Sequence, residues 1–303
     1  MLRKYHLCRY LSSDRDGGAL TAQPTIDLLT AIKLGQLLNT TYDTSPSDVT
    51  NQAGQKVSAD GTDYTVVTTI YANDLATDIN PSRGDDEVSI GLICQADQTG
   101  DVAIAIRGTE GTLEWIHDAE FLSVPCPFLT GAGHTEDGFT AMYESLRTGV
   151  APNSPTVVSA LAKLPFPRPV SSVAICGHSL GGALATLLAL DVAANTVFKD
   201  PAAYTFGSPR TGDSLFANTY DQVVKNSYRV ANRLDIVPTL PPPVDYDHVL
   251  NPYELNPIRF LPLPPKILVK FNPGCEHSLQ TYLYLLSLQS GGAVLPLEAT
   301  CQP

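Results

Sequence analysis

Apolar residues in this chain recur in two patterns, one typical of helices and one typical of buried strands. Over residues 25–38 they fall largely at helical spacing, which predicts an amphipathic helix. The next segment, 40–63, is rich in Ser, Thr, Asp and Gly, and it is predicted to be a loop or linker. Two runs rich in β-branched residues, 64–71 and 88–94, predict early strands.

From residue 102 onward, short apolar runs alternate with helical patterns. Strands are predicted at 102–106, 173–176, 203–206, 228–231 and 267–271, and helices at 138–146, 157–164, 180–194, 214–224 and 278–288. This alternation indicates βαβ units and a mostly parallel sheet covered by helices on both faces. Ligands bind outside the carboxyl ends of such strands, so each catalytic residue is expected to follow a strand.

One segment interrupts this alternation. Residues 238–265 carry many prolines, among them Pro241-Pro242-Pro243, and are predicted to be an irregular excursion rather than a helix. Neither a repeat nor a clear domain boundary is visible. A chain of 303 residues with 43% hydrophobic residues can bury a large core, so we expect a single α/β domain over 1–303, with 1–20 as a candidate poorly ordered extension.

Composition narrows the function classes. A formal net charge of −12 without a basic patch argues against nucleic acid as a partner, because a polyanion is repelled. No uninterrupted apolar stretch is long enough to predict a transmembrane segment. The basic start Met1–Arg9 lacks the apolar run of a signal peptide, so none is predicted there.

Six cysteines permit three disulfides but show no CxxC spacing, and Cys176 is predicted to be a buried thiol.

The pattern Gly177-His178-Ser179-Leu180-Gly181 follows the strand predicted at 173–176 and opens the helix predicted at 180–194. A serine hydroxyl is a weak nucleophile, so an enzyme must expose it, supply a base and stabilise the oxyanion. A G-x-S-x-G turn between strand and helix does this in the α/β-hydrolase fold. We therefore predict that fold, with Ser179 as the nucleophile.

In that fold the acid and the base follow the nucleophile in the order Ser, Asp, His. Asp235 comes just beyond the strand predicted at 228–231, where it can orient an imidazole and stabilise its charged form. Asp213, predicted to cap the next helix, competes with it, as do Asp221, Asp245 and Asp247. For the base, His277 follows the predicted strand at 267–271. His248 is the alternative, and a supporting or solvated loop histidine is its plainer interpretation.

Several separated segments together resemble the fungal-type class 3 lipases, a family of triacylglycerol lipases. They are Ile106 to Thr109, Trp115 to Asp118, Asp137-Gly138-Phe139, Gly177 to Gly182, Tyr204 to Arg210, Asn232 to Pro238 and His277. The resemblance implies that Thr109 and Leu180 supply the oxyanion hole. It also implies a lid helix over 111–117 that carries Trp115, although a core tryptophan is the plainer alternative. Glu136 departs from the pattern, since family members commonly have a histidine there, and no disulfide scheme is transferred.

The combined expectation is a carboxylic ester hydrolase, most simply a triacylglycerol lipase in lipid degradation, that needs neither a metal nor an organic cofactor. Its expected partners are a lipid or other ester substrate and a transient lipid–water interface. Feruloyl esterases, phospholipases and short-chain carboxylesterases on the same scaffold are the alternatives within the enzyme class, and a catalytically silent lipid-binding module is the alternative outside it. The resemblance favours a soluble, secreted protein, while the absence of a signal peptide leaves the compartment open.

Overall fold

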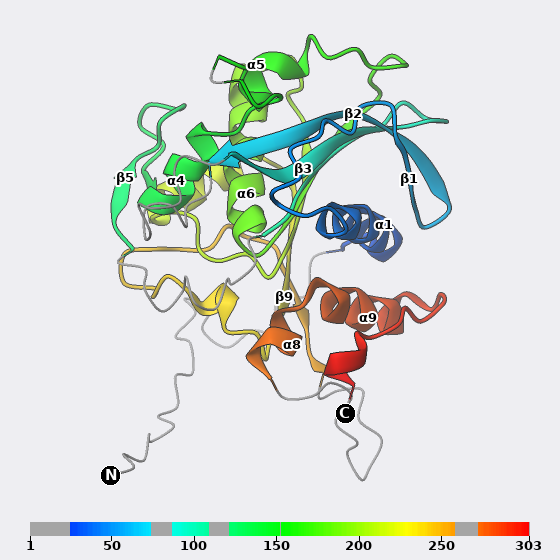
Figure 1. The fold of residues 1–303 in the computed structure, drawn as a ribbon. Helices are drawn as coiled ribbons and strands as arrows, with labels where there is room; N and C mark the ends of the chain where they lie inside the picture. The colour runs from blue at the N-terminus through cyan, green and yellow to red at the C-terminus, as the bar shows by residue number, and fades with distance from the viewer. Residues whose placement is uncertain (1–24, 74–86, 109–120, 152, 258–271, 303) are drawn as a thin grey trace.

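The computed structural model describes residues 25–73, 87–108, 121–151, 153–257 and 272–302. Within these residues an eight-stranded sheet has the order β1-β2-β3-β4-β7-β8-β9-β10 (Figure 1). The first four strands pair antiparallel: β1 (Lys56–Ala59), β2 (Thr62–Asn73), β3 (Glu87–Ala96) and β4 (Val102–Ile106). From β4 the sheet continues in parallel through β7 (Val173–His178), β8 (Ala202–Phe206), β9 (Asn226–Asn232) and β10 (Pro252–Leu255). The mostly parallel sheet predicted from the sequence is confirmed.

Helices cover both faces of this sheet. On one face lie α1 (Leu28–Asn39) and α9 (Leu279–Ser290), side by side in Figure 1. The other face is covered by α4 (Asp137–Glu144), α5 (Val157–Leu161), α6 (Leu180–Asn195) and α7 (Ser214–Val223). A two-stranded ribbon of β5 (Ser123–Pro125) and β6 (His134–Glu136) precedes α4. The layers are those that the alternation of strands and helices predicts.

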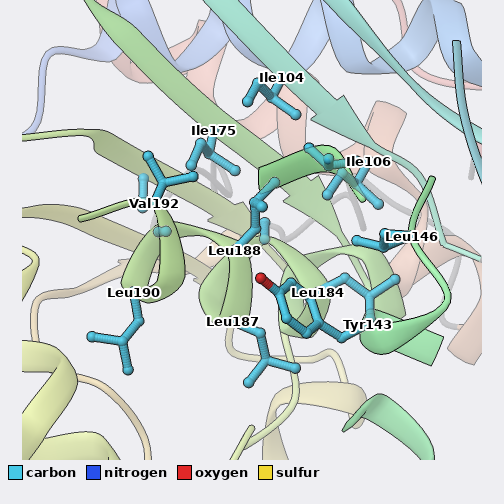
Figure 2. Close-up of a cluster of buried hydrophobic side chains, with 14 of the residues drawn as sticks. Ile104, Ile106, Tyr143, Leu146, Ile175, Leu184, Leu187, Leu188, Leu190 and Val192 are labelled. Carbon is cyan, nitrogen blue, oxygen red and sulfur yellow. The ribbon is translucent and has the colours of Figure 1, made fainter. Parts of the chain in front are cut away.

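Strand β4 shows how one sequence serves both faces. Its isoleucines, Ile104 and Ile106, belong to the core beneath α6, and the alternating alanines, Ala103 and Ala105, belong to the core beneath α1. Figure 2 shows these isoleucines with Ile175 of β7 above Leu184 and Leu188 of α6, and all five side chains are buried. Burying such a side chain contributes roughly 1.5–3 kcal/mol, so this cluster anchors α6 firmly to the centre of the sheet.

Two predicted irregular segments contain strands. The prediction of a loop throughout 40–63 is wrong at β1, which pairs with β2 through a turn at Asp60-Gly61, where both residues have positive φ. Asp-Gly at such a turn is typical of a two-residue hairpin. The proline-rich excursion contains β10, which starts at Pro252 on the edge of the sheet, a place that tolerates proline. The strand predicted at 267–271 lies outside the described residues.

The prediction of a buried thiol at Cys176 is confirmed, since Cys176 is fully buried and forms no disulfide. A disulfide joins Cys275, in the short helix α8 (Pro273–His277), to Cys301 in the C-terminal 3-10 helix. It fastens the end of the described chain beside His277.

Candidate active site

Ser179 lies in a tight turn between β7 and α6. Its backbone has φ 59° and ψ −128°, a conformation that costs free energy for a residue with a side chain. Its N–H donates to the carbonyl oxygen of Phe206 in β8 at 2.9 Å, and the residue is 1% exposed. This strained strand-to-helix turn is the geometry expected of a nucleophile elbow.

The glycines on either side of the serine are required by close backbone packing. A Cβ on Gly177 would overlap the carbonyl oxygen of Gly181, and a Cβ on Gly181 would overlap the carbonyl oxygen of Ile106. A Cβ on Gly182 would come within 2.7 Å of the Cβ of Ser208. The turn therefore fits only because its neighbours lack side chains, as its G-x-S-x-G pattern predicts.

Asp235 and His277 form a buried pair. The Nδ1 atom of His277 lies 2.7 Å from Oδ2 of Asp235, and the exposed fractions of the two side chains are 8% and 0%. Because a carboxylate accepts, Nδ1 carries the proton and Nε2 keeps its lone pair. Nε2 is buried and has no hydrogen-bond partner within the described part of the chain. The imidazole is thus held in the tautomer that a general base requires.

This pair lies at the same edge of the sheet as the elbow. The rings of His178 and His277 are 4.7 Å apart between centroids, and His178 Nε2 donates to the backbone carbonyl of His277 at 2.7 Å. A Cβ on Gly207 would lie 3.0 Å from Oδ2 of Asp235 and 3.2 Å from Cε1 of His277. Gly207 directly follows Phe206, the acceptor for Ser179, so the structure brings the three predicted residues together.

Further groups hold Asp235, and sequence reasoning missed them. The Tyr282 hydroxyl donates to Oδ2 of Asp235 at 2.6 Å, and the Val237 N–H donates to Oδ1 at 2.9 Å. Burial raises the pKa of Tyr282 well above its ordinary value, so the phenol keeps its proton. The Asn232 amide donates to the Glu276 carbonyl at 2.9 Å and ties the end of β9, just before Asp235, to helix α8, which carries His277. A tyrosine within an apolar helix gave no sign of this role.

The competing acid and base have other partners. Asp213 caps α7, as predicted, by accepting from the Phe216 N–H at 2.8 Å. His248 donates from Nε2 to the Pro238 carbonyl at 2.6 Å, and burial, followed by the charges of Arg229 and Arg210, lowers its pKa well below the ordinary value. This hydrogen bond ties His248 to the loop that follows Asp235.

The predicted oxyanion hole lies partly within the described residues. Leu180 is the first residue of α6, and N–H groups in the first turn of a helix have no acceptor within that helix. Thr109 lies outside the described residues, as does Trp115 of the predicted lid. The residue before Thr109, Gly108, is described: a Cβ on it would come within 2.9 Å of the Ser179 Cβ. The chain therefore passes from β4 directly against the elbow.

Glu136 replaces the histidine of the related pattern and has a local role. Its carboxylate caps α4 by accepting from the Phe139 N–H at 2.7 Å. Burial raises its pKa, which the two N–H groups of the helix start partly oppose. With glutamate at this position, the start of α4 is therefore capped.

A separate cavity of about 320 Å³ lies between α4, α5 and α6. Asp191 in its wall accepts from the Tyr143 hydroxyl at 2.6 Å and from the Asn195 amide at 2.7 Å. None of its lining residues belongs to the predicted triad.

In the described part of the chain, no group of three or more His, Cys, Asp or Glu residues is placed to hold a metal ion. Among the same residues, no helix is long and apolar enough to cross a membrane.

The model of the class 3 lipase family matches residues 103–245, which include Ser179 and Asp235. This region belongs to the class 3 lipase family. A secreted mono- and diacylglycerol lipase of Fusarium solani is 38% identical over 161 residues, which are 52% of this chain and 44% of that protein. Phospholipase A1-II 7 of Oryza sativa is 30% identical over 222 residues, which are 64% of this chain and 53% of that protein. The chain thus spans about half the length of these two relatives.

Solved lipase structures share the architecture. The Rhizomucor miehei lipase–propeptide complex is 26% identical, has a TM-score of 0.55, and matches 75% of this chain and 67% of that chain. A Penicillium cyclopium structure, at 23% identity, has a TM-score of 0.57 over 76% and 78% of the two chains. The fold of this chain is the α/β-hydrolase fold, as the sequence predicts.

Proposed function

We propose that this chain is a serine ester hydrolase that cleaves lipid esters, with Ser179, His277 and Asp235 as its catalytic triad. The observation that carries the proposal is the buried His277–Asp235 pair beside a serine held at positive φ. A buried carboxylate that fixes one imidazole tautomer next to such a serine is the arrangement that acyl transfer requires.

The proposed reaction has two halves. His277 Nε2 takes the proton of the Ser179 hydroxyl while the oxygen attacks the ester carbonyl, and the alcohol then leaves with that proton. Water attacks the acyl-enzyme in the same way, giving the free acid and restoring the serine. Asp235 keeps Nδ1 protonated throughout and stabilises the imidazolium. The N–H groups of Leu180 and Thr109 are proposed to bind the oxyanion in both halves.

The substrate is proposed to be a glycerolipid. The Fusarium relative is named for mono- and diacylglycerol, which supports a lipase, and a lid at 111–117 carrying Trp115 would then open at a lipid–water interface. Phospholipase A1 activity is the second candidate, because the Oryza relative matches the longer stretch of this chain. The Cys275–Cys301 disulfide supports secretion, since disulfides persist in oxidising compartments.

Hydrolysis of p-nitrophenyl esters by the wild type and by Ser179→Ala tests the chemistry. The variant is expected to lose at least about 10³-fold in kcat, as loss of a triad nucleophile does. Equal rates in the two proteins would leave the catalytically silent module as the better account. A panel of triglyceride, diacylglycerol, phospholipid, feruloyl and C2–C18 esters then separates the enzyme classes, and a preference for monomeric over emulsified esters would count against the lid.

A further inference from the structure

The hydroxyl of Tyr42 lies where two loops of the candidate site meet. Tyr42 ends the 3-10 helix Thr40–Tyr42 that follows α1, far from Ser179 in sequence. Its Oη atom is 2.7 Å from Nδ1 of His178 and 2.8 Å from the backbone N of Gly108. Gly108 belongs to the turn after β4, and His178 is the residue before the nucleophile. One hydroxyl thus joins the turn that leads to Thr109 to the elbow.

The direction of every hydrogen bond in this chain of contacts is fixed. The His277 carbonyl can only accept, so His178 Nε2 carries the proton of the bond between them at 2.7 Å. In the neutral ring Nδ1 then accepts from the Tyr42 hydroxyl, and the Tyr42 oxygen accepts from the Gly108 N–H. Burial, and then the neighbouring His277, lower the pKa of His178 to about 3, so the ring is neutral. Burial raises the pKa of Tyr42 to about 12, so the phenol keeps its proton.

We propose that Tyr42 is a positioning residue that aligns the turn at Gly108, the elbow and, through His178, the end of helix α8 that carries the base. The proposal rests on the proposed function, because it assigns Tyr42 to the same reaction. Gly108 packs against Ser179, so a small shift of this turn changes the backbone beside the attacking oxygen. The hydrogen bond from His178 to the His277 carbonyl continues this series of contacts and holds the backbone of the base. Tyr42 touches none of the reacting atoms itself.

The test is Tyr42→Phe, which removes only the shared oxygen. The expected result is a roughly ten- to hundredfold loss in kcat with KM within twofold, the scale seen when an oxyanion donor or a base is misplaced. Rates are expressed per active serine, titrated with a p-nitrophenyl phosphonate, so that misfolded protein does not contribute. Tyr220→Phe is the matched control: its buried hydroxyl lies 2.9 Å from Ser227 Oγ in the core, and its kcat is expected to stay within twofold.

A double-variant cycle with His178→Ala tests the coupling. If Tyr42 acts in part through His178, the fold-loss of kcat in the double variant is smaller than the product of the fold-losses in the two single variants. An unchanged kcat per titrated serine in Tyr42→Phe, or losses that simply multiply, overturns the proposal.

A readout without activity separates this proposal from the proposed function. The imidazole nitrogen NMR signals of His178 are expected to show a neutral Nε2–H ring whose Nδ1 shift moves in Tyr42→Phe and stays in Tyr220→Phe. If the Nδ1 chemical shift of His178 is the same in Tyr42→Phe and in the wild type, the proposed hydrogen bond from Tyr42 to His178 is overturned. A wild type without esterase activity and without a titratable serine overturns the proposed function, whatever the NMR signals show.

Discussion

The two halves of the candidate site are held by different physics. Every residue of α6 from Leu180 to Ala193 is buried, and the elbow before it is wedged between backbones with no space for a Cβ. Asp235, by contrast, lies in the loop after β9 and His277 ends the short helix α8, 42 residues later, and the two are held by side-chain hydrogen bonds and the neighbouring disulfide. Packing places the nucleophile, and polar contacts place the acid and the base.

Because of this difference, substitutions in the two halves should affect the free energy of unfolding and the reaction rate differently. A change at the elbow disturbs the core cluster shown in Figure 2, so the free energy of unfolding and the rate should fall together. A change among the polar contacts alters the tautomer or position of one imidazole, so the rate should fall first.

Asp235→Asn is expected to reduce kcat by about 10³- to 10⁴-fold while the protein stays folded, because an amide no longer holds His277 in the required tautomer. The measurement is kcat together with the denaturation midpoint. Asp245→Asn, at an exposed acid of the proline-rich segment, is the control and should keep kcat within twofold. Comparable losses in both variants would remove Asp235 from the triad.

Gly181→Ala is expected to lower the free energy of unfolding by more than about 3 kcal/mol, because its Cβ overlaps the Ile106 carbonyl and the backbone must shift. Chemical denaturation measures this loss, and activity should decline with it. Gly292→Ala is the control: its nearest atom is the Ser290 hydroxyl oxygen at 3.4 Å, so its cost should be under about 1 kcal/mol. A Gly181→Ala protein as stable as the wild type would contradict the packing account.

Replacing both Cys275 and Cys301 by serine is expected to cost about 3.5 kcal/mol of unfolding free energy, from the entropy of a loop with a sequence separation of 26. Guanidinium denaturation with and without a thiol reductant provides the test. The wild type should fall to the level of the variant on reduction, whereas the variant should not respond. A reductant effect on the variant itself would point to another cause.

Acidification should destabilise the protein through its buried neutral histidines. His178 stays neutral in the folded state down to its pKa of about 3, while in the unfolded chain it takes a proton near its ordinary value. The unfolded state therefore binds more protons between these values, so stability falls as pH decreases through the window, by up to about 1.4 kcal/mol per pH unit. His248 acts in the same direction.

Two buried carboxyls oppose this trend. Burial raises the pKa of Glu136 and Glu276, so their contribution is present at low pH and is lost as pH rises through the raised values. Denaturation midpoints of the wild type and of His178→Gln between pH 6.5 and 4.5 isolate the histidine. The variant should show the shallower dependence, and equal slopes would mean that His178 is not the group responsible.

The features that could be predicted from the sequence are those that a local pattern of residues determines. The elbow was visible because a buried strand, a glycine pair and an apolar helix are consecutive in sequence, and the order of strands and helices followed from their alternation. The strand at Lys56–Ala59 was missed because its polar composition outweighed the Asp60-Gly61 turn signal. Tyr42 and Tyr282 were missed for another reason: each contacts the site only through the tertiary fold, and no pattern around either residue marks it.

If Ser179 forms a covalent acyl-enzyme, its hydroxyl is activated, and a mass measurement can detect this activation. The intact protein is incubated with a p-nitrophenyl phosphonate, which transfers its phosphonyl group to an activated serine, and the modified peptide is sequenced. We predict a single adduct on Ser179 within the peptide that contains Gly177–Gly181, and none in Ser179→Ala. An adduct on another residue, or equal labelling of the two proteins, would contradict the account.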